Sequence, residues 1–385
     1  MAAPQPSGKY LPLSRGGQAF VPDPLPPDIA WTEALVARLS EADRVIGQLA
    51  GEGGRLPNPH LLIRPFVRRE AVLSSKIEGT QATLGELLQA EAGVHVERSP
   101  DDLREVGNYV VALEEGVTRL AKLPLSLRLT RELHKTLMTG ARGDSAAPGE
   151  FRRTQNWIGP PGSSPATARF VPPPPNEVGP CLDTWEKFLH ERKLPPLAQA
   201  ALLHYQFEAI HPFLDGNGRV GRLLITLFLI ERGVLPSPLL YLSAYFEATR
   251  RDYYDLLTAV STRSEWQPWL EYFLYGVATQ ANDALERTAK INSLLDTWRR
   301  RLASRQAKTV MSLIERIATN PFITVNGAAA HLKVAFTTAQ RAIDALVSHR
   351  VLKQVNESRR DRVYCAQALL AILDEPAAFI QAEKT

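Results

Sequence analysis

Residues 211–222, which read His-Pro-Phe-Leu-Asp-Gly-Asn-Gly-Arg-Val-Gly-Arg, constrain the fold of this chain more than any other stretch. They follow an apolar segment with helical periodicity, residues 197–210, and Pro212 prevents that helix from continuing. Two glycines around Asn217 predict a tight loop, after which a second apolar helix begins. The stretch therefore predicts two consecutive helices joined by a glycine-rich loop, with His211 at the C-terminal edge of the first.

This loop carries the groups that phosphate chemistry requires. A helix N-terminus offers backbone N–H groups and a positive dipole end to an anion, and glycines let the backbone approach phosphate oxygens. Arg219 and Arg222 are three positions apart, so their guanidinium groups share one helix face beside the same anion. His211 is a candidate general base near neutral pH, and Asp215 is a candidate ligand for a divalent cation that bridges phosphates.

Each of these residues, taken alone, has a simpler interpretation, in which His211 caps a helix and the arginines are surface charges. Eight specified residues in twelve positions argue against that interpretation. The residues themselves therefore predict a site for a nucleotide polyphosphate.

The composition sets few other limits. A chain of 385 residues with a net charge of +4 is long enough for two or three domains, and its mild charge does not by itself imply nucleic acid. Cys181 and Cys365 lie far apart and form no metal-ligand pattern, which favours free thiols in a reducing compartment. The longest apolar run, residues 223–230, is too short to span a membrane, and the polar, proline-rich N-terminus does not resemble a signal peptide. We expect a cytoplasmic protein with no membrane partner.

Hydrophobic periodicity predicts a mainly α fold with one β-hairpin. Residues 1–28 are rich in proline and glycine and are expected to form an extended arm. The hairpin is predicted at 149–171, where two β-prone runs flank a Gly/Pro/Ser-rich loop that four prolines follow. Helices are predicted at 29–50, 65–78, 83–93, 101–120, 126–138, 179–190, 196–210, 218–231, 249–261 and 266–294.

From about residue 308 the pattern predicts a winged helix-turn-helix, with helices at 308–319, 325–332 and 336–348 and short strands at 351–355 and 362–365. Basic residues outnumber acidic ones between His331 and Arg362, which suits contact with DNA phosphates. A module used for dimerisation or protein docking fits the pattern equally well, so both roles stay open. The basic residues are Lys333, Arg341, Arg350, Lys353, Arg359, Arg360 and Arg362.

The stretch at 211–222 resembles the signature of Fic-domain (Fic/DOC) proteins, His-Pro-Phe-x-x-Gly-Asn-Gly-Arg-x-x-Arg, and departs from it at no fixed position. The resemblance implies transfer of AMP from ATP to a Ser, Thr or Tyr hydroxyl of a protein. It implies that His211 is the base and that Asp215 binds Mg²⁺. The intact second half of the signature is typical of AMP transfer, since relatives that phosphorylate lack the last arginine.

The same resemblance assigns the phosphate-binding residues. Gly216 and Gly218 would line the anion hole together with Asn217, while Arg219 and Arg222 would hold the β- and γ-phosphates. A segment further along resembles the family's wall against the adenine, where Tyr253 or Tyr254 could stack on the base, although aromatic residues at helical spacing more often belong to the core. His204 is expected to pack in the core.

A second motif, Ser-Ser-Lys-Ile-Glu-Gly at residues 74–79, lies upstream. Ser74 and Glu78 share a helix face, and a glutamate at a helix C-terminus gains from a cationic partner elsewhere, although an exposed glutamate on a solvated face would read the same way. The motif resembles the Fic family's inhibitory sequence, [Ser/Thr]-x-x-x-Glu-[Gly/Asn]. It implies that Glu78 pairs with Arg222 and blocks productive placement of the γ-phosphate, with Ser74 as support.

We therefore expect four regions: an arm at 1–28, a helical N-terminal segment with the inhibitory helix at 29–95, a Fic domain with a hairpin flap at 96–295, and a winged helix-turn-helix at 308–385. The expected function is an ATP- and Mg²⁺-dependent protein adenylyltransferase restrained by Glu78. Its target is a protein hydroxyl, the chain's own included. Alternatives are a nucleotide-sensing, DNA-binding regulator and a phosphodiesterase that removes AMP, with Glu78 positioning a water. A homodimer is left open.

Overall fold

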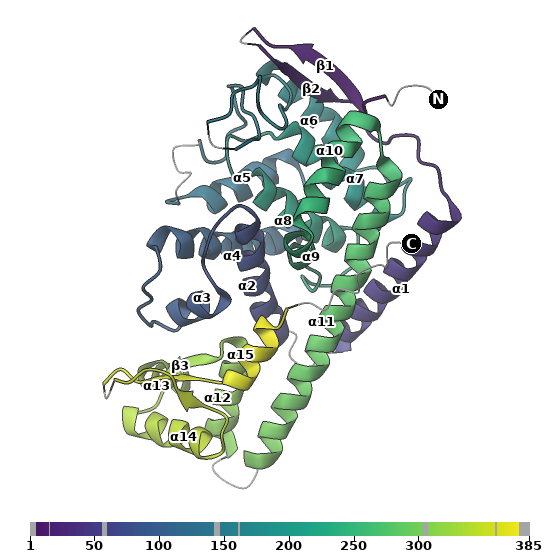
Figure 1. Ribbon diagram of the computed structural model, residues 1–385. Coiled ribbons are helices and arrows are strands. Elements are labelled where there is room, and N and C mark those ends of the chain that lie inside the picture. The colour runs from purple at the N-terminus through teal and green to yellow at the C-terminus, as the bar shows by residue number, and fades with distance from the viewer. Residues whose placement is uncertain are drawn as a thin grey trace.

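The computed structural model describes residues 5–14, 16–55, 60–141, 147–160, 162–302, 307–358 and 360–376, and the predicted mainly α class is confirmed (Figure 1). No helix within these ranges combines the length and the apolar character needed to cross a bilayer. The first eleven helices are α1 (Glu33–Arg55), α2 (His60–Ile77), α3 (Leu84–Glu91), α4 (Pro100–Leu120), α5 (Leu127–Met138), α6 (Pro175–Leu189), α7 (Pro196–Ile210), α8 (Asn217–Glu231), α9 (Ser243–Ala248), α10 (Arg250–Arg263) and α11 (Trp266–Leu302).

Helices α7 and α8 form the centre of the core and lie side by side. Nearly every residue of both helices is buried, which explains why α7 is apolar on all sides instead of along one stripe. Helices α4, α5, α6 and α11 pack around this pair. The loop that joins α7 to α8 is therefore held by the most tightly packed part of the molecule.

The N-terminal arm contains a β-hairpin that the sequence analysis did not predict. Strands β1 (Gly8–Pro12) and β2 (Gln18–Pro22) pair in antiparallel register (Figure 1). The Phe20 N–H donates to the Val171 carbonyl at 2.8 Å, and the Phe20 ring lies 5.8 Å from that of Phe170. Tertiary contact with residues 170–171 thus orders a segment whose proline and glycine content predicted an extended arm.

The hairpin predicted at 149–171 is reduced to one isolated bridge, between Ile158 and Phe170. Other polar groups of this segment bond elsewhere: Asn156 Nδ2 donates to the Phe213 carbonyl at 3.0 Å, and Trp157 Nε1 donates to the Ser163 carbonyl at 2.9 Å. The prediction of two paired strands was wrong because these side chains bond the core and the loop itself.

The C-terminal module, residues 307–376, begins beyond the end of α11 and occupies one end of the molecule (Figure 1). Its sheet has the antiparallel order β3-β5-β4, and both β3 and α15 are additions to the predicted elements. Arg359, one of the predicted wing residues, lies outside the described residues. The elements are α12 (Ala307–Thr319), β3 (Phe322–Thr324), α13 (Val325–Leu332), α14 (Phe336–Ser348), β4 (Lys353–Gln354), β5 (Val363–Cys365) and α15 (Gln367–Asp374).

Helix α2 connects this module to the core. Helices α12 and α15 pack against α2, and Asn320 Nδ2 donates to the Leu88 carbonyl at 2.9 Å in a buried contact. Arg69 of α2 lies 3.7 Å from Asp283 of α11 and donates to the Glu375 carbonyl at 3.3 Å. The last turn of α2 carries Ser74, so one helix contacts both the C-terminal module and the predicted inhibitory motif.

We expect Phe228→Ala to lower the free energy of unfolding by about 3–5 kcal/mol, because the Phe228 side chain is buried in α8 and its removal leaves a cavity in the central pair of helices. Urea unfolding followed by circular dichroism measures the change. Val111→Ala is the matched control, since Val111 is 47% exposed and its loss should cost no more than about 0.5 kcal/mol. Equal effects of the two substitutions would contradict this packing.

Candidate active site

His211 ends α7 in a left-handed backbone conformation, with φ of 49° and ψ of 62°. An L-residue pays about 1–2 kcal/mol for this conformation, so the surrounding contacts must hold it. Its N–H donates to the Phe207 carbonyl at 2.9 Å, which completes the last turn of the helix. Pro212 follows and turns the chain away, as predicted.

Arg152 supplies the contacts that hold this turn. Its Nε donates to the His211 carbonyl at 2.9 Å, and its Nη2 donates to the carbonyls of Pro173 at 2.6 Å and Ile210 at 3.3 Å. Only 4% of Arg152 is exposed, and its own backbone N–H donates to the Pro212 carbonyl at 2.9 Å. Sequence reasoning missed this residue, because a lone arginine in a loop carries no signal of the carbonyls it will meet.

The environment of His211 keeps its imidazole neutral. Burial and, after it, the nearby positive charge of Arg152 lower the pKa of His211 to about 4. The ring is therefore unprotonated at neutral pH and can accept a proton, as a general base must.

His134 holds the loop that follows. Its Nδ1 accepts from the Gly149 N–H at 2.9 Å, so the ring proton is on Nε2, which donates to the Asp215 carbonyl at 3.0 Å. The ring stacks on Phe213 with centroids 3.7 Å apart, and burial lowers the pKa of His134 to about 4. A neutral histidine thus fixes the backbone of Asp215, whose side chain remains 55% exposed.

The Asn217 side chain has a structural role that sequence reasoning did not assign, whereas Gly216 forms part of the tight loop that it predicted. The Asn217 side chain accepts from the Phe213 N–H at 2.8 Å and donates to the Phe213 carbonyl at 2.9 Å. Because its side chain makes these two bonds and the residue is 2% exposed, Asn217 would contribute its backbone N–H to the anion hole, and its place there stays a prediction. Gly216 has φ of 76°, and a Cβ there would lie 2.7 Å from Met138 Sδ.

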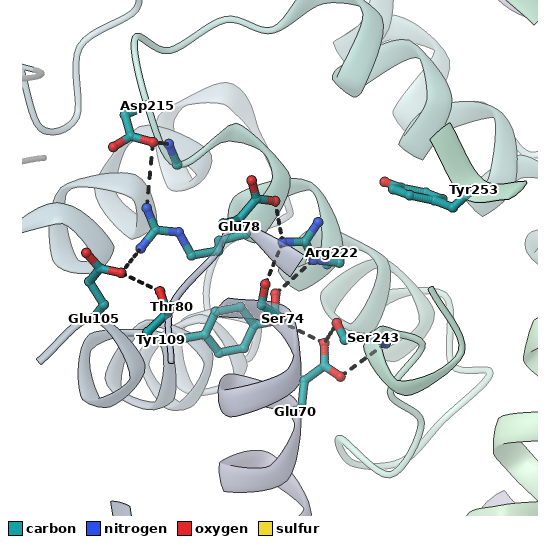
Figure 2. A network of polar contacts seen from close by, with 12 residues as sticks. Glu70, Ser74, Glu78, Thr80, Glu105, Tyr109, Asp215, Arg222, Ser243 and Tyr253 are labelled. Atoms are coloured by element: carbon teal, nitrogen blue, oxygen red, sulfur yellow. Dashed lines mark hydrogen bonds and ion pairs between the residues drawn. The ribbon is translucent and has the colours of Figure 1, made fainter. Parts of the chain in front are cut away.

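Arg222 is buried and paired with the upstream motif (Figure 2). Its Nη2 lies 2.8 Å from Glu78 Oε1 and donates to the Ser74 carbonyl at 2.9 Å, while its Nε donates to Ser74 Oγ at 2.9 Å. Burial raises the pKa of Glu78, but Arg222 outweighs that effect and leaves it below its usual range. Both groups are therefore charged at neutral pH, and the structure brings together the two motifs that the sequence singled out.

Glycine is required at position 218 for this pairing. A Cβ on Gly218 would lie 2.2 Å from Glu78 Oε1 and 2.9 Å from Arg222 Nη1. The Glu78 carboxylate thus sits directly against the first turn of α8, where N–H groups without an intrahelical partner favour an anion. In this structure a carboxylate of the chain itself lies in the region predicted for phosphate.

Arg219 is buried at the other side of this first turn. Its Nη1 lies 3.6 Å from Glu105 Oε2 and its Nη2 lies 3.7 Å from Asp215 Oδ1. Neither its Nε nor its Nη1 has a hydrogen-bond partner among the described residues. Buried donors without partners are rare in folded proteins, so these two N–H groups are suited to oxygens of a bound ligand.

Two further glutamates near Arg222 were not predicted: Glu70, which is buried, and Glu208, which is half-buried. Glu70 accepts from Ser243 Oγ at 2.5 Å and from the Tyr109 hydroxyl at 3.2 Å (Figure 2). Glu208 Oε1 has no hydrogen-bond partner within the described ranges, and a Cβ on Gly221 would lie 2.5 Å from it. Burial raises the pKa of each carboxyl to about 7; the Ser243 hydrogen bond and then Arg222 partly offset this effect at Glu70, and Arg222 does so at Glu208.

The structure separates the two tyrosines proposed for the adenine wall. Tyr253 is 1% exposed, stacks on Phe246 with centroids 4.6 Å apart, and bonds His204 Nε2 through its hydroxyl at 2.9 Å. The Tyr253 candidate is therefore wrong, because its ring is part of the core, as is His204. Tyr254 is half-buried, and the Arg169 guanidinium lies 5.7 Å from its ring, so Tyr254 alone stays a candidate.

We expect the His211 ring signals in NMR spectra to remain constant between pH 7 and about 5.5, because a pKa near 4 keeps the ring neutral throughout that range. Comparison with His211→Gln assigns the signals. In urea, the histidines should titrate near the ordinary value of about 6.5. A midpoint near 6.5 for His211 in the folded protein would contradict the burial described here.

Comparisons with known proteins agree with this geometry. Residues 36–118 match the family model described as Fic/DOC family N-terminal, and residues 124–229 match the Fic/DOC family model. Curated relatives named protein adenylyltransferase Fic, from Drosophila grimshawi and Drosophila yakuba, are 32% and 31% identical over 167 residues, which is 42% of this chain. The aligned region spans 32% and 31% of those relatives, so this chain matches about a third of their length.

Solved structures share the fold. A Fic family protein from Desulfovibrio desulfuricans has a TM-score of 0.58 at 21% identity, covering 89% of this chain and 98% of that one. A Fic domain containing signaling protein from Bacteroides thetaiotaomicron has a TM-score of 0.51 at 21% identity, covering 66% of this chain and 96% of that one. Both Fic/DOC family models match, and the signature loop lies between two central helices, so residues 36–118 and 124–229 of this chain are similar to the two parts of Fic/DOC family proteins.

Proposed function

We propose that this chain is a protein adenylyltransferase that transfers AMP from ATP to a hydroxyl of a protein, and that Glu78 restrains it in the form described here. The observation that carries the proposal is the position of a neutral His211 at one end of a loop whose other end is the N-terminus of α8. A proton acceptor and an anion site are thereby held a few residues apart by a rigid core. The curated relatives that bear the name adenylyltransferase support the same reaction.

His211 would take the proton of the target hydroxyl. The hydroxyl oxygen then attacks the α-phosphorus of ATP, a new P–O bond forms, and the bond to the β-phosphate breaks, so that AMP stays on the target and pyrophosphate leaves. The backbone N–H groups at Asn217 and Gly218 would stabilise the negative charge on the phosphoryl oxygens. Because Arg152 and His134 lock the two sides of the loop, little reorganisation is needed at the moment of reaction.

Asp215 fits the role of Mg²⁺ ligand. Its Oδ1 accepts from the Gly216 N–H at 2.6 Å, and its side chain is 55% exposed at the mouth of the loop. In the part of the chain that the structure describes, no three His, Cys, Asp or Glu residues gather into a site that could hold a metal by themselves. Mg²⁺ is commonly bound by one or two carboxylates together with substrate phosphates and waters, so one carboxylate suits it, and the ion would neutralise phosphate charge.

Glu78 would inhibit the reaction by occupying the guanidinium group meant for the γ-phosphate. Its carboxylate lies 2.8 Å from Arg222 Nη2 and against the backbone of Gly218. A phosphate cannot use the same donor while this carboxylate holds it, and two anions there would repel each other. Ser74 would keep Arg222 oriented through its two bonds to the guanidinium.

The sequence predictions for location and assembly extend this proposal. Two buried free thiols, Cys181 and Cys365, support a reducing compartment such as the cytoplasm. Exposed basic side chains on the C-terminal module support a role in binding DNA phosphates. Among the described residues, these exposed basic side chains are Lys333, Arg341, Arg350, Lys353 and Arg360.

We expect Glu78→Gly to raise His211-dependent transfer of radiolabelled AMP to proteins by at least about tenfold, because it frees Arg222 for the nucleotide. The double variant with His211→Ala should show no transfer. Glu247→Gln is the matched control, since Glu247 also pairs with a residue of α2, Lys76, at 2.9 Å, but does not contact Arg222.

Absence of transfer by Glu78→Gly, in a folded protein that binds ATP, would overturn the proposed activity. If wild type instead releases AMP from a modified target and Glu78→Gly does not, the phosphodiesterase alternative is correct. Mass spectrometry of modified proteins, comparing Glu78→Gly with His211→Ala, identifies the target and shows whether the chain modifies itself.

We expect the C-terminal module to bind duplex DNA with an affinity that falls steeply as salt rises, because such binding releases counterions from phosphates. Fluorescence anisotropy of a labelled duplex at two salt concentrations, with the full chain, measures it. Sedimentation of the same samples reports whether the chain is a dimer. Salt-independent or undetectable binding would leave protein docking as the role of the module.

A further inference from the structure

Beside the Glu78–Arg222 pair, a second group of polar contacts links Thr80 of the inhibitory segment, through Glu105, to Arg219, the other signature arginine (Figure 2). The Thr80 hydroxyl donates to Glu105 Oε2 at 2.7 Å, and the same oxygen lies 3.6 Å from Arg219 Nη1. Arg219 Nη2 in turn lies 3.7 Å from Asp215 Oδ1. Thr80 comes two residues after Glu78, so both signature arginines are connected to residues 74–80.

The residues that make the Thr80–Glu105–Arg219 contacts are buried. Thr80 is 3% exposed, Glu105 is 6% exposed and Arg219 is 4% exposed. A buried carboxylate or guanidinium costs several kcal/mol unless opposite charges and hydrogen bonds compensate it, so each member depends on the others for its position. Glu105 belongs to α4, a helix that packs against both α8 and α2, and its carboxylate lies where these helices meet.

Arg219 is held by ion pairs more than by hydrogen bonds. Glu105 and Asp215 approach the guanidinium at ion-pair distances, while Nε and Nη1 keep no hydrogen-bond partner within the described ranges. Glu105 therefore supplies the charge that allows Arg219 to be buried beside the loop, at an ion-pair distance and without a hydrogen bond to its Nη1. This is the behaviour expected of a group that orients a binding residue.

We propose that Glu105 is a positioning residue for Arg219, and that Thr80 uses the same carboxylate to latch the inhibitory segment in place. The catalytic consequence rests on the proposed adenylyltransferase function, whereas the consequence for ATP binding does not. Gly79, with φ of 98°, lies between the two anchors and is the flexible joint of the segment. Thr80 stays bonded to Glu105 when Glu78 leaves Arg222. The Glu78 carboxylate therefore remains at a high effective concentration near Arg222 and returns to it readily.

Two substitutions separate the two roles. Thr80→Val removes the hydroxyl but leaves Glu105 charged, so it should weaken the latch alone. Glu105→Gln keeps an acceptor for Thr80 but removes the charge that faces Arg219, so it should act on nucleotide binding. Thr80→Ser, which retains the hydroxyl, should restore wild-type behaviour. Thr136→Val is the matched control, because Thr136 makes the same kind of bond, to Glu115 Oε2 at 2.8 Å, on the exposed side of α4 and α5.

Isothermal titration of the full chain with ATP and Mg²⁺ gives the dissociation constant without requiring any transfer. We expect Thr80→Val to tighten ATP binding about tenfold in the wild-type background and to change nothing in the Glu78→Gly background, where no carboxylate is left to latch. We expect Glu105→Gln to weaken ATP binding about tenfold in the Glu78→Gly background. Where transfer occurs, KM for ATP should change in parallel, with kcat changed less than about twofold.

The proposal is overturned if folded Thr80→Val binds ATP as wild type does, or tightens it equally in both backgrounds. It is also overturned if Glu105→Gln leaves ATP affinity unchanged. Thermal unfolding checks each variant, and Thr80→Ala, with a smaller side chain, replaces Thr80→Val if the latter does not fold. If Glu78→Gly binds ATP but transfers no AMP, the proposed activity fails while these affinities still decide the roles of Glu105 and Thr80.

Discussion

The ion pair between Arg222 and Glu78 is the interaction on which the described state of the site depends. A guanidinium buried in the central helix pair needs a counter-charge, and the chain supplies one from α2 at 2.8 Å. Ser74 adds two acceptors on the same helix turn. The energetic requirement of a buried charge and the proposed restraint of the reaction are thus met by one contact.

Helix α2 links this contact to the C-terminal module and to α11. It packs against α12 and α15 of the C-terminal module and brings Arg69 to Asp283 of α11, while its last turn reaches Arg222. Glu70, one turn before Ser74, is buried under Ser243 and Tyr109. Any displacement of Glu78 therefore takes place at the end of a helix that is otherwise firmly packed, which favours movement at Gly79 over movement of the whole helix.

Prediction from sequence succeeded where the controlling signals are local. Pro212 and the glycines around Asn217 place the helix ends that the structure has, and the apolar periodicity of residues 197–210 corresponds to a buried helix. It failed for the hairpin at 149–171, whose side chains bond the core, and for the N-terminal arm, which gains order only against residues 170–171. The prediction that Tyr253 could stack on the adenine was also wrong, since helical spacing does not distinguish a residue that lines a site from one in the core.

The sequence by itself determined the helix–loop–helix at 211–222 and the chemical groups that it carries, because proline, glycine and periodicity act over a few residues. Only the tertiary structure decided which partners those groups meet. Glu78 and Arg222 are 144 positions apart, and Arg152 reaches the His211 carbonyl from 59 positions away. Such pairings are set by how the helices pack and by the cost of burying an uncompensated charge. Neither can be predicted from a short segment of the sequence.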